Sequence, residues 1–540
     1  MNPRDGNIIY FGPGVHEINS PYGILKLKSN QTVYIAGGGV LRARIHAENA
    51  ENIKIMGRGI LEGTFLKGRW PEPLREIMGE DPRTERPYFV DIRQSENIVI
   101  EGIIIKDTPH WTVRLLDSKN ININNLKLVG YVPNSDGIDC VNSRDIIIDD
   151  VFIRTSDDCL AVKGLKDSKT MASAKNIIVK NSTFWADAAS ALEIGHETVM
   201  EEIRNVRFEN IDILMQRYQT LGYHAMDITA VDNAVIRNIY YDNIRVERCS
   251  RLAGIRINKS MWCTSERRGI VKDIYFKNIC CMSNPDIHLF GYTDKHIVEN
   301  VTFENLFVNG KMPGDFPALK TNFYVKDIKL VQNGNTVSHI HRPYPQDLSF
   351  RPVNISPYTN FSLAGMINEM SGETQKGAEA QRSGEEQASP ADSYAPCEFA
   401  AGPVPFLLAG DAGIKTAAAI SGKGGAYPAK SRNIPILNYV RYIFFLHTLN
   451  SAESDIHTLA FKYEIAYENG CSAEIPVYSK TDISGFDLWS LAGWQYTIDG
   501  IRVYIMQWKN PNPDWKIKHV RMASEANDEI PVMLGLTLGQ

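Results

Sequence analysis

Between residues 50 and 310 the hydrophobic and polar positions follow one pattern that recurs along the chain. Each copy has an Asn or Asp, an alternating apolar-polar stretch, a second Asn or Asp and another alternating stretch. Clear copies begin at Asn97, Asn120 and Asp145, which lie 23 and 25 residues apart, and later copies begin near residues 176, 203, 235, 271 and 297. This period is typical of solenoids, and period-two alternation in segments rich in Ile and Val predicts strands. The pattern therefore predicts stacked strand-bend-strand coils, with the extra residues of longer copies forming loops.

The recurring Asn residues are expected to be structural. Asn favours turns, and stacked copies of it form amide ladders from coil to coil. We therefore expect these side chains, whether inward-facing or in turns, to hold the coils in register and to take no part in chemistry.

The pattern changes twice after the solenoid. Residues 361–395 are rich in Glu, Gln, Ser, Gly and Ala and have almost no large apolar residue, so they are predicted to be a low-complexity linker. Residues 396–540 return to short alternating segments separated by Gly, Pro and Asn, the pattern of a β-sandwich. The chain is thus predicted to be all-β, with a parallel β-helix over residues 1–360 and a β-sandwich accessory domain over 396–540.

Composition and charge limit the kinds of partner that this protein is expected to bind. A formal net charge of -5 shows no excess of positive charge, which argues against a nucleic-acid partner. No apolar run approaches the length of a membrane span and no export signal is visible, so we expect no membrane insertion and a cytoplasmic location. The 8 cysteines are too sparse for a disulfide scaffold and form no Cys-x-x-Cys motif. The sequence predicts no metal and no cofactor, and it leaves the oligomeric state open.

Two acidic clusters stand out in the solenoid, Asn134–Asp139 and Ser156–Lys163. Asp136 and Asp157 lie 21 residues apart, about one coil, and neighbouring parallel strands are about 4.8 Å apart. We therefore expect these aspartates to be spatial neighbours whose mutual repulsion raises at least one pKa. Hydrolysis of a glycosidic bond needs one carboxylic acid and one carboxylate, which is the chemistry this pair could supply.

At this point the chain resembles the polygalacturonase-type glycoside hydrolases of family 28, with a weaker likeness to the dextranases and isopullulanases of family 49. Four segments in family order carry the resemblance over residues 30–310: Asn134-Ser135-Asp136, Asp157-Asp158, Gly195-His196-Glu197 and Arg256-Ile257-Asn258. It implies a right-handed parallel β-helix and an inverting mechanism. It also implies Asp157 as general acid, Asp136 and Asp158 as the residues that activate water, and His196 as a supporting residue.

Residues predicted to bind the substrate surround these positions: Asn134, Lys163, Glu193, Arg256 and Asn258. In the family, the Arg and Lys of the last motif hold the carboxylate of galacturonate, whereas here Asn258 stands at the Lys position. Lys259 follows it, but neighbouring residues of a strand point to opposite faces. The substrate is therefore predicted to be an oligo- or polysaccharide other than plain polygalacturonate, attacked in an exo fashion if long loops close one end of the cleft. The cationic loop from Phe65 to Arg86 means that an anionic sugar remains a possible ligand.

Two other functions fit the same fold. A β-helix polysaccharide lyase or C5-epimerase would act on a uronate polymer, often with calcium on its acidic groups. A non-catalytic carbohydrate-binding solenoid would tolerate loss of the aspartates. In the C-terminal region, Trp489, Trp494, Trp508 and Trp515 could stack on sugar rings, although core packing is the commoner use of Trp.

Overall fold

The computed structural model divides into two compact units, residues 1–343 and 344–540. It describes residues 6–66, 88–130, 132, 134–216, 223–260, 262–342, 349–353, 355, 361–362, 397–401, 404–408, 416–419, 429–450, 459–478, 495–498, 501–524 and 530–540. Within these ranges no helix is long and apolar enough to cross a membrane, and the helical turns Pro21–Gly23 and Thr64–Leu66 are both 3-10.

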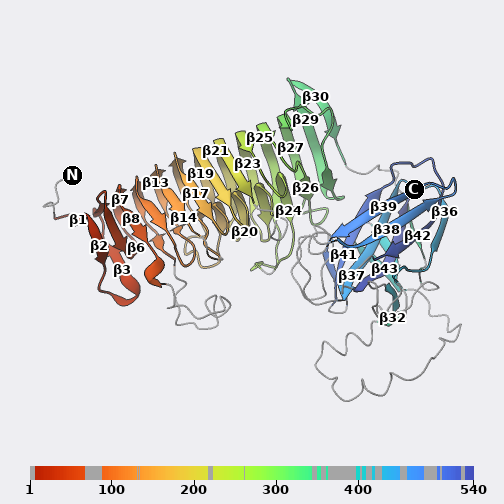
Figure 1. Cartoon of the computed structure of the whole chain (residues 1–540), viewed down its shortest axis with the longest axis horizontal. Helices are drawn as coiled ribbons and strands as arrows, with labels where there is room; N and C mark the ends of the chain where they lie inside the picture. Colours follow the sequence, from red (N-terminus) through yellow and green to blue (C-terminus); the bar gives the residue numbers. More distant parts are fainter. Residues whose placement is uncertain are drawn as a thin grey trace, which may run out of the picture. The chain divides into compact units, whose positions relative to one another are not determined.

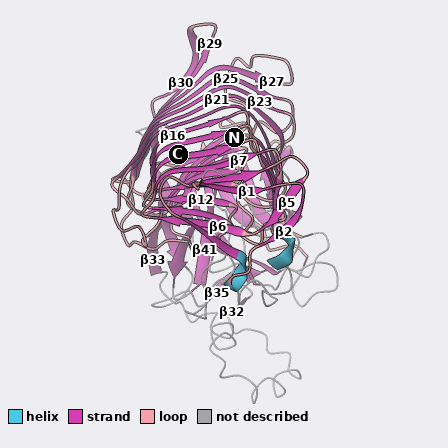
Figure 2. Ribbon diagram, turned by 90° about the vertical axis from the view of Figure 1, so that its left-hand side faces the viewer, coloured by secondary structure: helices cyan, strands magenta, loops and turns pink. Residues whose placement is uncertain are grey.

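The first unit is a parallel β-helix, as predicted, whose coils are stacked from β1 to β30 (Figures 1 and 2). One wall is an 11-stranded sheet in which every pairing is parallel. Its strands are β3 (Ile24–Leu27), β6 (Arg44–Glu48), β9 (Val90–Arg93), β12 (Val113–Leu116), β15 (Ile138–Val141), β18 (Leu160–Gly164), β20 (Leu192–Thr198), β22 (Met226–Ala230), β24 (Ala253–Ile257), β26 (Ile287–Phe290) and β28 (Leu319–Thr321).

The rest of the coil forms a 19-stranded sheet, parallel except for its last pairing, β29 with β30. Its strands are β1 (Ile8–Phe11), β2 (Gly14–Glu17), β4 (Thr32–Ile35), β5 (Gly39–Arg42), β7 (Glu51–Gly57), β8 (Ile60–Glu62), β10 (Glu96–Glu101), β11 (Ile104–Lys106), β13 (Lys119–Asn124), β14 (Lys127–Val129), β16 (Arg144–Asp149), β17 (Phe152–Thr155), β19 (Ala174–Ala186), β21 (Glu202–Gln216), β23 (Val235–Val246), β25 (Ile270–Cys281), β27 (Val298–Val308), β29 (Val325–Gln332) and β30 (Asn335–Ile340).

The recurring Asn and Asp residues lie at bends of this sheet, in the left-handed backbone region that Asn adopts more readily than most residues. Asn120, Asn176 and Asn205 have φ of 57°, 56° and 55°. Their amides donate to the preceding coil, for example Asn176 Nδ2 to Asp145 Oδ1 at 2.8 Å and Asn205 Nδ2 to Asn176 Oδ1 at 3.2 Å. These ladders are exposed, so the Asn side chains are turn-placed and do not face the core.

The interior is built of columns in which each coil places one apolar side chain above the last. One column runs in register through Ile100, Ile123, Ile148, Val179, Phe208, Tyr241, Phe276, Phe303 and Leu330. All of these are buried, and the rings of Tyr241 and Phe276 stack with centroids 4.8 Å apart. The coil spacing therefore sets both the ladders outside and the packing inside.

The second unit is a β-sandwich of antiparallel strands. One sheet contains β31 (Phe350–Val353), β32 (Phe361–Ser362), β35 (Thr416–Ala419), β37 (Tyr442–Asn450), β40 (Gln495–Ile498), β41 (Ile501–Lys509) and β43 (Ile530–Gly539), the other β36 (Ile434–Asn438), β38 (Leu459–Tyr467), β39 (Ser472–Tyr478) and β42 (Ile517–Ala523), and β33 (Cys397–Ala401) pairs with β34 (Val404–Leu408). Phe445 and Leu536 from the first sheet share a core with Tyr463 and Val520 from the second.

The boundary differs from the predicted one at residue 360. The first unit ends at Pro343, because β31 pairs with β43, near the C-terminus, and Phe361–Ser362 pair with β35. These segments belong to the sandwich although they precede the polar stretch. Residues 363–395 of the predicted linker lie outside the described residues.

The inner column gives a stability prediction. Phe276→Ala should lower the free energy of unfolding by about 3–5 kcal/mol, since it opens a cavity between two stacked rings. Tyr275→Ala is the matched control, because the Tyr275 ring is only partly buried and stacks on Tyr240, with the ring centroids 4.9 Å apart, for a loss of about 1 kcal/mol. Thermal unfolding followed by circular dichroism measures both, and equal losses would contradict the assigned faces.

Candidate active site

The acidic segments of the sequence lie where the coils enter the 11-stranded sheet. Asp136 precedes β15, and Asp157 and Asp158 precede β18, its parallel neighbour. The N–H of Gly137 donates to the carbonyl of Asp158 at 2.8 Å, and the N–H of Asn134 donates to Oδ2 of Asp157 at 3.1 Å. Parallel register thus places residues that are one coil apart in the sequence side by side, as expected.

The three aspartates converge on one point. One carboxylate oxygen from each of Asp136, Asp157 and Asp158 lies within 4.8 Å of the other two. The N–H of Ser190 donates to Asp158 Oδ1 at 3.0 Å, and the N–H of Asp158 donates to Asp157 Oδ1, also at 3.0 Å. Asp136 Oδ1 is buried and has no hydrogen-bond partner within the described residues.

A buried lysine holds this group together. Nζ of Lys163 lies 2.8 Å from Asp136 Oδ2, 3.4 Å from Asp139 Oδ1 and 3.8 Å from Asp158 Oδ2. It also lies 4.2 Å from the centre of the Trp111 ring, a cation–π contact. The ammonium of Lys163 thus lies against the aspartates, so the cation beside these carboxylates comes from the protein itself. Binding of substrate by Lys163 stays a prediction.

Burial dominates the protonation of the site. It raises the pKa of Asp136 and Asp158 well above the usual value, against the opposing effect of Lys163. It also raises the pKa of Asp157, and Lys163 and the backbone N–H groups of Asp158 and Asn134 oppose that rise. Burial works against the charge of Lys163, but Asp136 and Asp139 raise its pKa well above the ordinary value. The group therefore retains a proton at a pH where exposed aspartates have lost theirs.

A pocket opens over the aspartates. Of the predicted residues it is lined by Asn134, Asp136, Asp157, Asp158, Lys163 and His196. Sequence reasoning gave no role to Glu197, which stands in the Gly195-His196-Glu197 segment, and missed the remaining lining residues, which are His110, Trp111, Tyr223 and Trp262. Coil register could have found Trp111, because Thr112, the next residue, donates its N–H to the carbonyl of Asp136 at 2.8 Å. Tyr223 and Trp262 lie in loops between coils, where the repeat pattern gives no signal.

His196 faces the aspartates as a neutral ring. Burial, helped by Arg256, lowers its pKa to about 3, so it is uncharged near neutral pH. Neither ring nitrogen has a hydrogen-bond partner within the described residues, and the ring packs edge-on against Tyr223 at 5.6 Å. Gly195 before it has a φ of +119°, and a Cβ there would lie 2.1 Å from the Thr229 carbonyl oxygen. Only glycine therefore allows the strand to approach β22 so closely beside the histidine.

Glu193, Asp227 and Arg256 form a second buried polar group beside the pocket. Glu193 and Asp227 are paired in register on β20 and β22. Arg256 Nη2 donates to Asp227 Oδ2 at 2.6 Å and to Thr229 Oγ1 at 2.9 Å. Burial, and then the charge of Asp227, raise the pKa of Glu193 well above its usual value. The structure places Glu193 and Arg256 beside the aspartates but outside the lining of the pocket.

At position 258, where the family has a lysine, this chain has an asparagine. Asn258 follows β24, and its Oδ1 is buried without a hydrogen-bond partner in the described part of the chain. Lys259 is 60% exposed and lies 3.7 Å from Glu266, so it does not replace a cation at position 258. The cationic loop of the sequence, residues 67–86, lies outside the described residues.

The sequence of this chain matches a known enzyme family. The sequence profile of the glycosyl hydrolases family 28 matches residues 23–330, a span that contains the coils of the pocket. More than half of the chain is covered, and the chain therefore belongs to glycosyl hydrolase family 28. The predicted family resemblance is confirmed.

Curated relatives cover part of the chain. A probable exopolygalacturonase B of Neosartorya fischeri is 24% identical over 230 residues, which is 37% of this chain and 48% of that protein. An isopullulanase of Aspergillus niger is 25% identical over 286 residues, 48% of each. The chain spans about half the length of these curated relatives.

Among solved structures, an exopolygalacturonase of Thermotoga maritima is 18% identical. The match covers 63% of this chain and 86% of that one, with a TM-score of 0.47.

Glu193 gives a pH-dependent prediction. A carboxyl whose folded-state pKa is raised contributes its stability below the unfolded pKa and loses it as pH rises toward the folded pKa. Glu193→Gln should therefore match the wild type at pH 4 and be more stable at pH 8, since each pH unit between the two pKa values costs the wild type about 1.4 kcal/mol. Urea unfolding at both pH values measures this. A stability difference that is independent of pH would show that Glu193 is not held in its protonated form.

Proposed function

We propose that this chain hydrolyses glycosidic bonds of an oligo- or polysaccharide by acid-base catalysis at the Asp136, Asp157 and Asp158 group. The observation that carries the proposal is the convergence of three buried carboxylates at the base of a pocket, with raised pKa values and one unpartnered oxygen. Such a group can both donate a proton to a leaving oxygen and accept one from water. Membership of family 28 supports the same reaction class.

In this proposal Asp157 protonates the leaving oxygen, and Asp136 and Asp158 orient and deprotonate a water. Lys163 contacts both of the latter carboxylates, which opposes the rise in their pKa that burial causes and keeps them aimed at one point. His196 is neutral and acts as a positioning residue at the pocket wall. The two backbone N–H groups that bind Asp157 stabilise its carboxylate once the proton has been given away.

Inversion of the anomeric centre is the stereochemical part of the proposal. Inverting enzymes usually separate acid and base by about 6.5–9.5 Å, and the nearest oxygens here are closer, within 4.8 Å. Distance alone would thus favour retention. The arrangement of two carboxylates on one lysine supports inversion, because a covalent nucleophile needs a single carboxylate whereas water activation can use two.

For the substrate we propose a sugar other than plain polygalacturonate. Arg256 is 1% exposed and is neutralised by Asp227, Lys163 is neutralised by the catalytic aspartates, and Asn258 stands where a second cation is expected. Binding a uronate carboxylate by Arg256 would require breaking a buried ion pair, which is costly. The relatives include an isopullulanase and exopolygalacturonases, so their names are compatible with either a neutral sugar or a uronate. The latter support exo attack.

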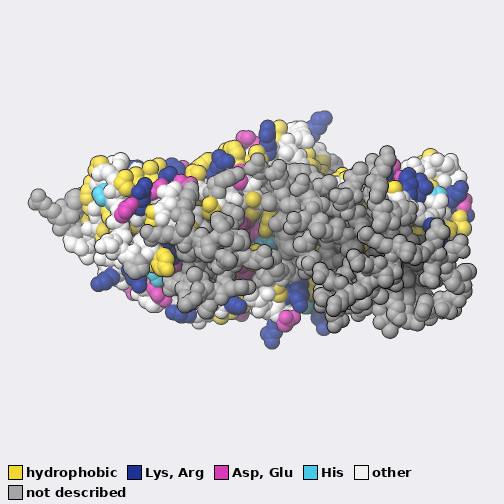
Figure 3. Space-filling view, turned by 60° about the horizontal axis from the view of Figure 1, so that its bottom comes forward, with side chains coloured by type: hydrophobic (Ala, Val, Ile, Leu, Met, Phe, Trp, Pro, Cys, Tyr) yellow, Lys and Arg dark blue, Asp and Glu magenta, His cyan; other side chains and the backbone are white. Residues whose placement is uncertain are grey.

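The surface charge visible in Figure 3 does not favour an anionic polysaccharide as substrate. On the face of the molecule shown in Figure 3, basic and acidic side chains lie interspersed over the described surface of the solenoid. On that face such a mixture provides no broad positive field to concentrate a polyanion. Within the pocket, Trp111, Tyr223 and Trp262 offer rings for stacking on sugars.

The acid role gives a mutational prediction. Asp157→Asn should lower kcat by about 10²–10⁴-fold while leaving sugar binding within a few-fold, because the amide keeps the shape but cannot supply a proton. Asp150→Asn, at an exposed bend with φ of 52° that suits Asn, is the matched control and should retain full activity. Release of reducing ends and calorimetric binding measure the two effects. Full turnover in Asp157→Asn would refute the assignment.

The reaction and the substrate can be tested together on a panel of neutral and uronate oligosaccharides. We expect a neutral or differently substituted sugar to be cleaved at least tenfold faster than galacturonate oligomers, since about 1.4 kcal/mol of binding gives that ratio. The first product followed by NMR should have the inverted configuration. A retained anomer would reject inversion, and unsaturated uronate products would identify a lyase instead.

A further inference from the structure

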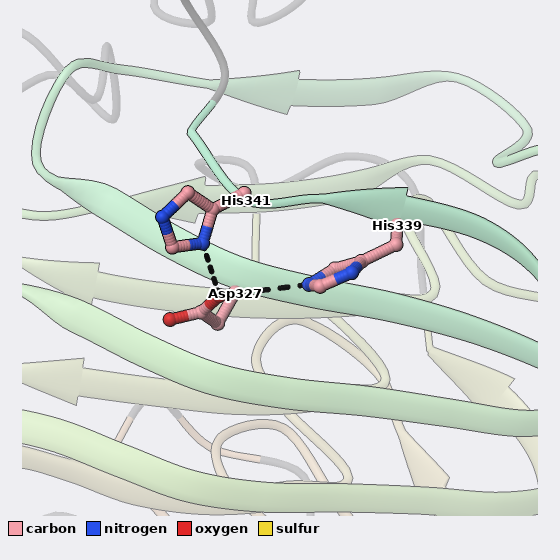
Figure 4. Close-up of side chains that lie close together, drawn as sticks. All are labelled: Asp327, His339 and His341. Carbon is pink, nitrogen blue, oxygen red and sulfur yellow. Dashed lines mark hydrogen bonds and ion pairs between the residues drawn. The ribbon is translucent and has the colours of Figure 1, made fainter.

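Far along the solenoid from the aspartates, the last turn of the β-helix carries a cluster that the proposed hydrolysis does not use. Asp327 on β29 faces His339 on β30 and His341 just beyond it (Figure 4). Oδ1 of Asp327 lies 2.6 Å from Nδ1 of His341 and 3.5 Å from Nε2 of His339. Three potential ligand atoms, one from each residue, lie within 4.8 Å of one another.

The backbone fixes these three side chains. β29 and β30 pair antiparallel with Ile328 opposite Ile340, and the N–H of Asp327 donates to the carbonyl of His341 at 3.0 Å. Asp327 and His341 are thus opposite one another, and His339 and His341 share a face because they are two residues apart. The cluster stands on paired strands, which hold ligands more precisely than a loop does.

Asp327 also ends the Asn ladder described above. Its φ is 54°, the ladder conformation, and the preceding coils connect through amides, as in Asn300 Nδ2 to Asp273 Oδ1 at 2.6 Å. A carboxylate cannot donate to the coil before it. At the final position the ladder therefore presents an acceptor, and both groups that face it are imidazoles, which are also metal ligands.

We propose that Asp327, His339 and His341 bind a divalent transition metal ion, with zinc as the representative ion. Two imidazole nitrogens and one carboxylate oxygen form a donor set that zinc accepts, whereas Ca²⁺ and Mg²⁺ take oxygen ligands. In a tetrahedral zinc site, ligand atoms are about 3.3 Å apart, and the two distances to Asp327 Oδ1 bracket that value. The side chain of His341 is 70% exposed, so solvent can supply the fourth ligand. The metal would fasten the end of β30 to β29.

The test is a Zn²⁺ titration of the chelator-treated full chain by calorimetry. We expect one ion per chain in the wild type and at least tenfold weaker binding in His339→Ala, His341→Ala and Asp327→Asn. Asp327→Asn is the most informative variant, since Asn suits both the left-handed backbone and the ladder. His519→Ala is the control, because His519 on β42 belongs to neither group of potential ligands in the described residues and should leave binding unchanged.

Two further measurements separate a metal site from histidines that merely hydrogen-bond Asp327. Zn²⁺ should slow hydrogen exchange of the Asp327 amide in the wild type and leave it unchanged in Asp327→Asn. Co²⁺ should give the visible spectrum of nitrogen and oxygen ligation. The proposal is overturned if the wild type binds no Zn²⁺, if the His339→Ala, His341→Ala double variant binds as well as the wild type, or if a thiolate band points to exposed Cys471.

Discussion

The structure depends on the stacking of one coil on the next in parallel register. Each coil is displaced from its neighbour by one strand spacing, about 4.8 Å, and every other feature of the first unit follows from that displacement. It brings the Asn amides within hydrogen-bond distance of each other, stacks Tyr241 on Phe276 inside, and joins the loops that carry Asp136 and Asp157. The site is therefore a product of the repeat, which brings a carboxylate oxygen from each of its three aspartates within 4.8 Å of the other two.

This explains which parts of the site were predictable. The β-helix and the pairing of Asp136 with Asp157 followed from periodicity, because a fixed repeat length converts sequence distance into spatial distance. The role of Lys163 did not follow, since its side chain reaches back along the sheet to Asp136 and Asp139 and periodicity does not describe side-chain direction. The inter-coil residues Tyr223 and Trp262 were missed for the related reason that loops escape the repeat.

Three buried cations in the 11-stranded sheet are each paired with a carboxylate. Lys163 is matched by aspartates, Arg256 by Asp227, and Arg114 by Asp91 at 2.9 Å, all within the same wall of the solenoid. Buried ions of this kind are tolerated because each has a partner. In this wall neither Lys163 nor Arg256 is an unpaired cation.

The antiparallel strand β30 covers the edge of the last parallel strand, β29. A stack of parallel coils ends in an open row of N–H and C=O groups, which can template pairing with another chain and lead to aggregation. Here β29 is followed by the tight turn at Asn333-Gly334, both with positive φ, and β30 reverses direction over it. The pairing contains an irregularity after Leu330, and such bulges twist an edge away from regular pairing. β30 thus replaces the regular edge of β29 with an irregularly paired strand, which disfavours pairing of this sheet with another chain.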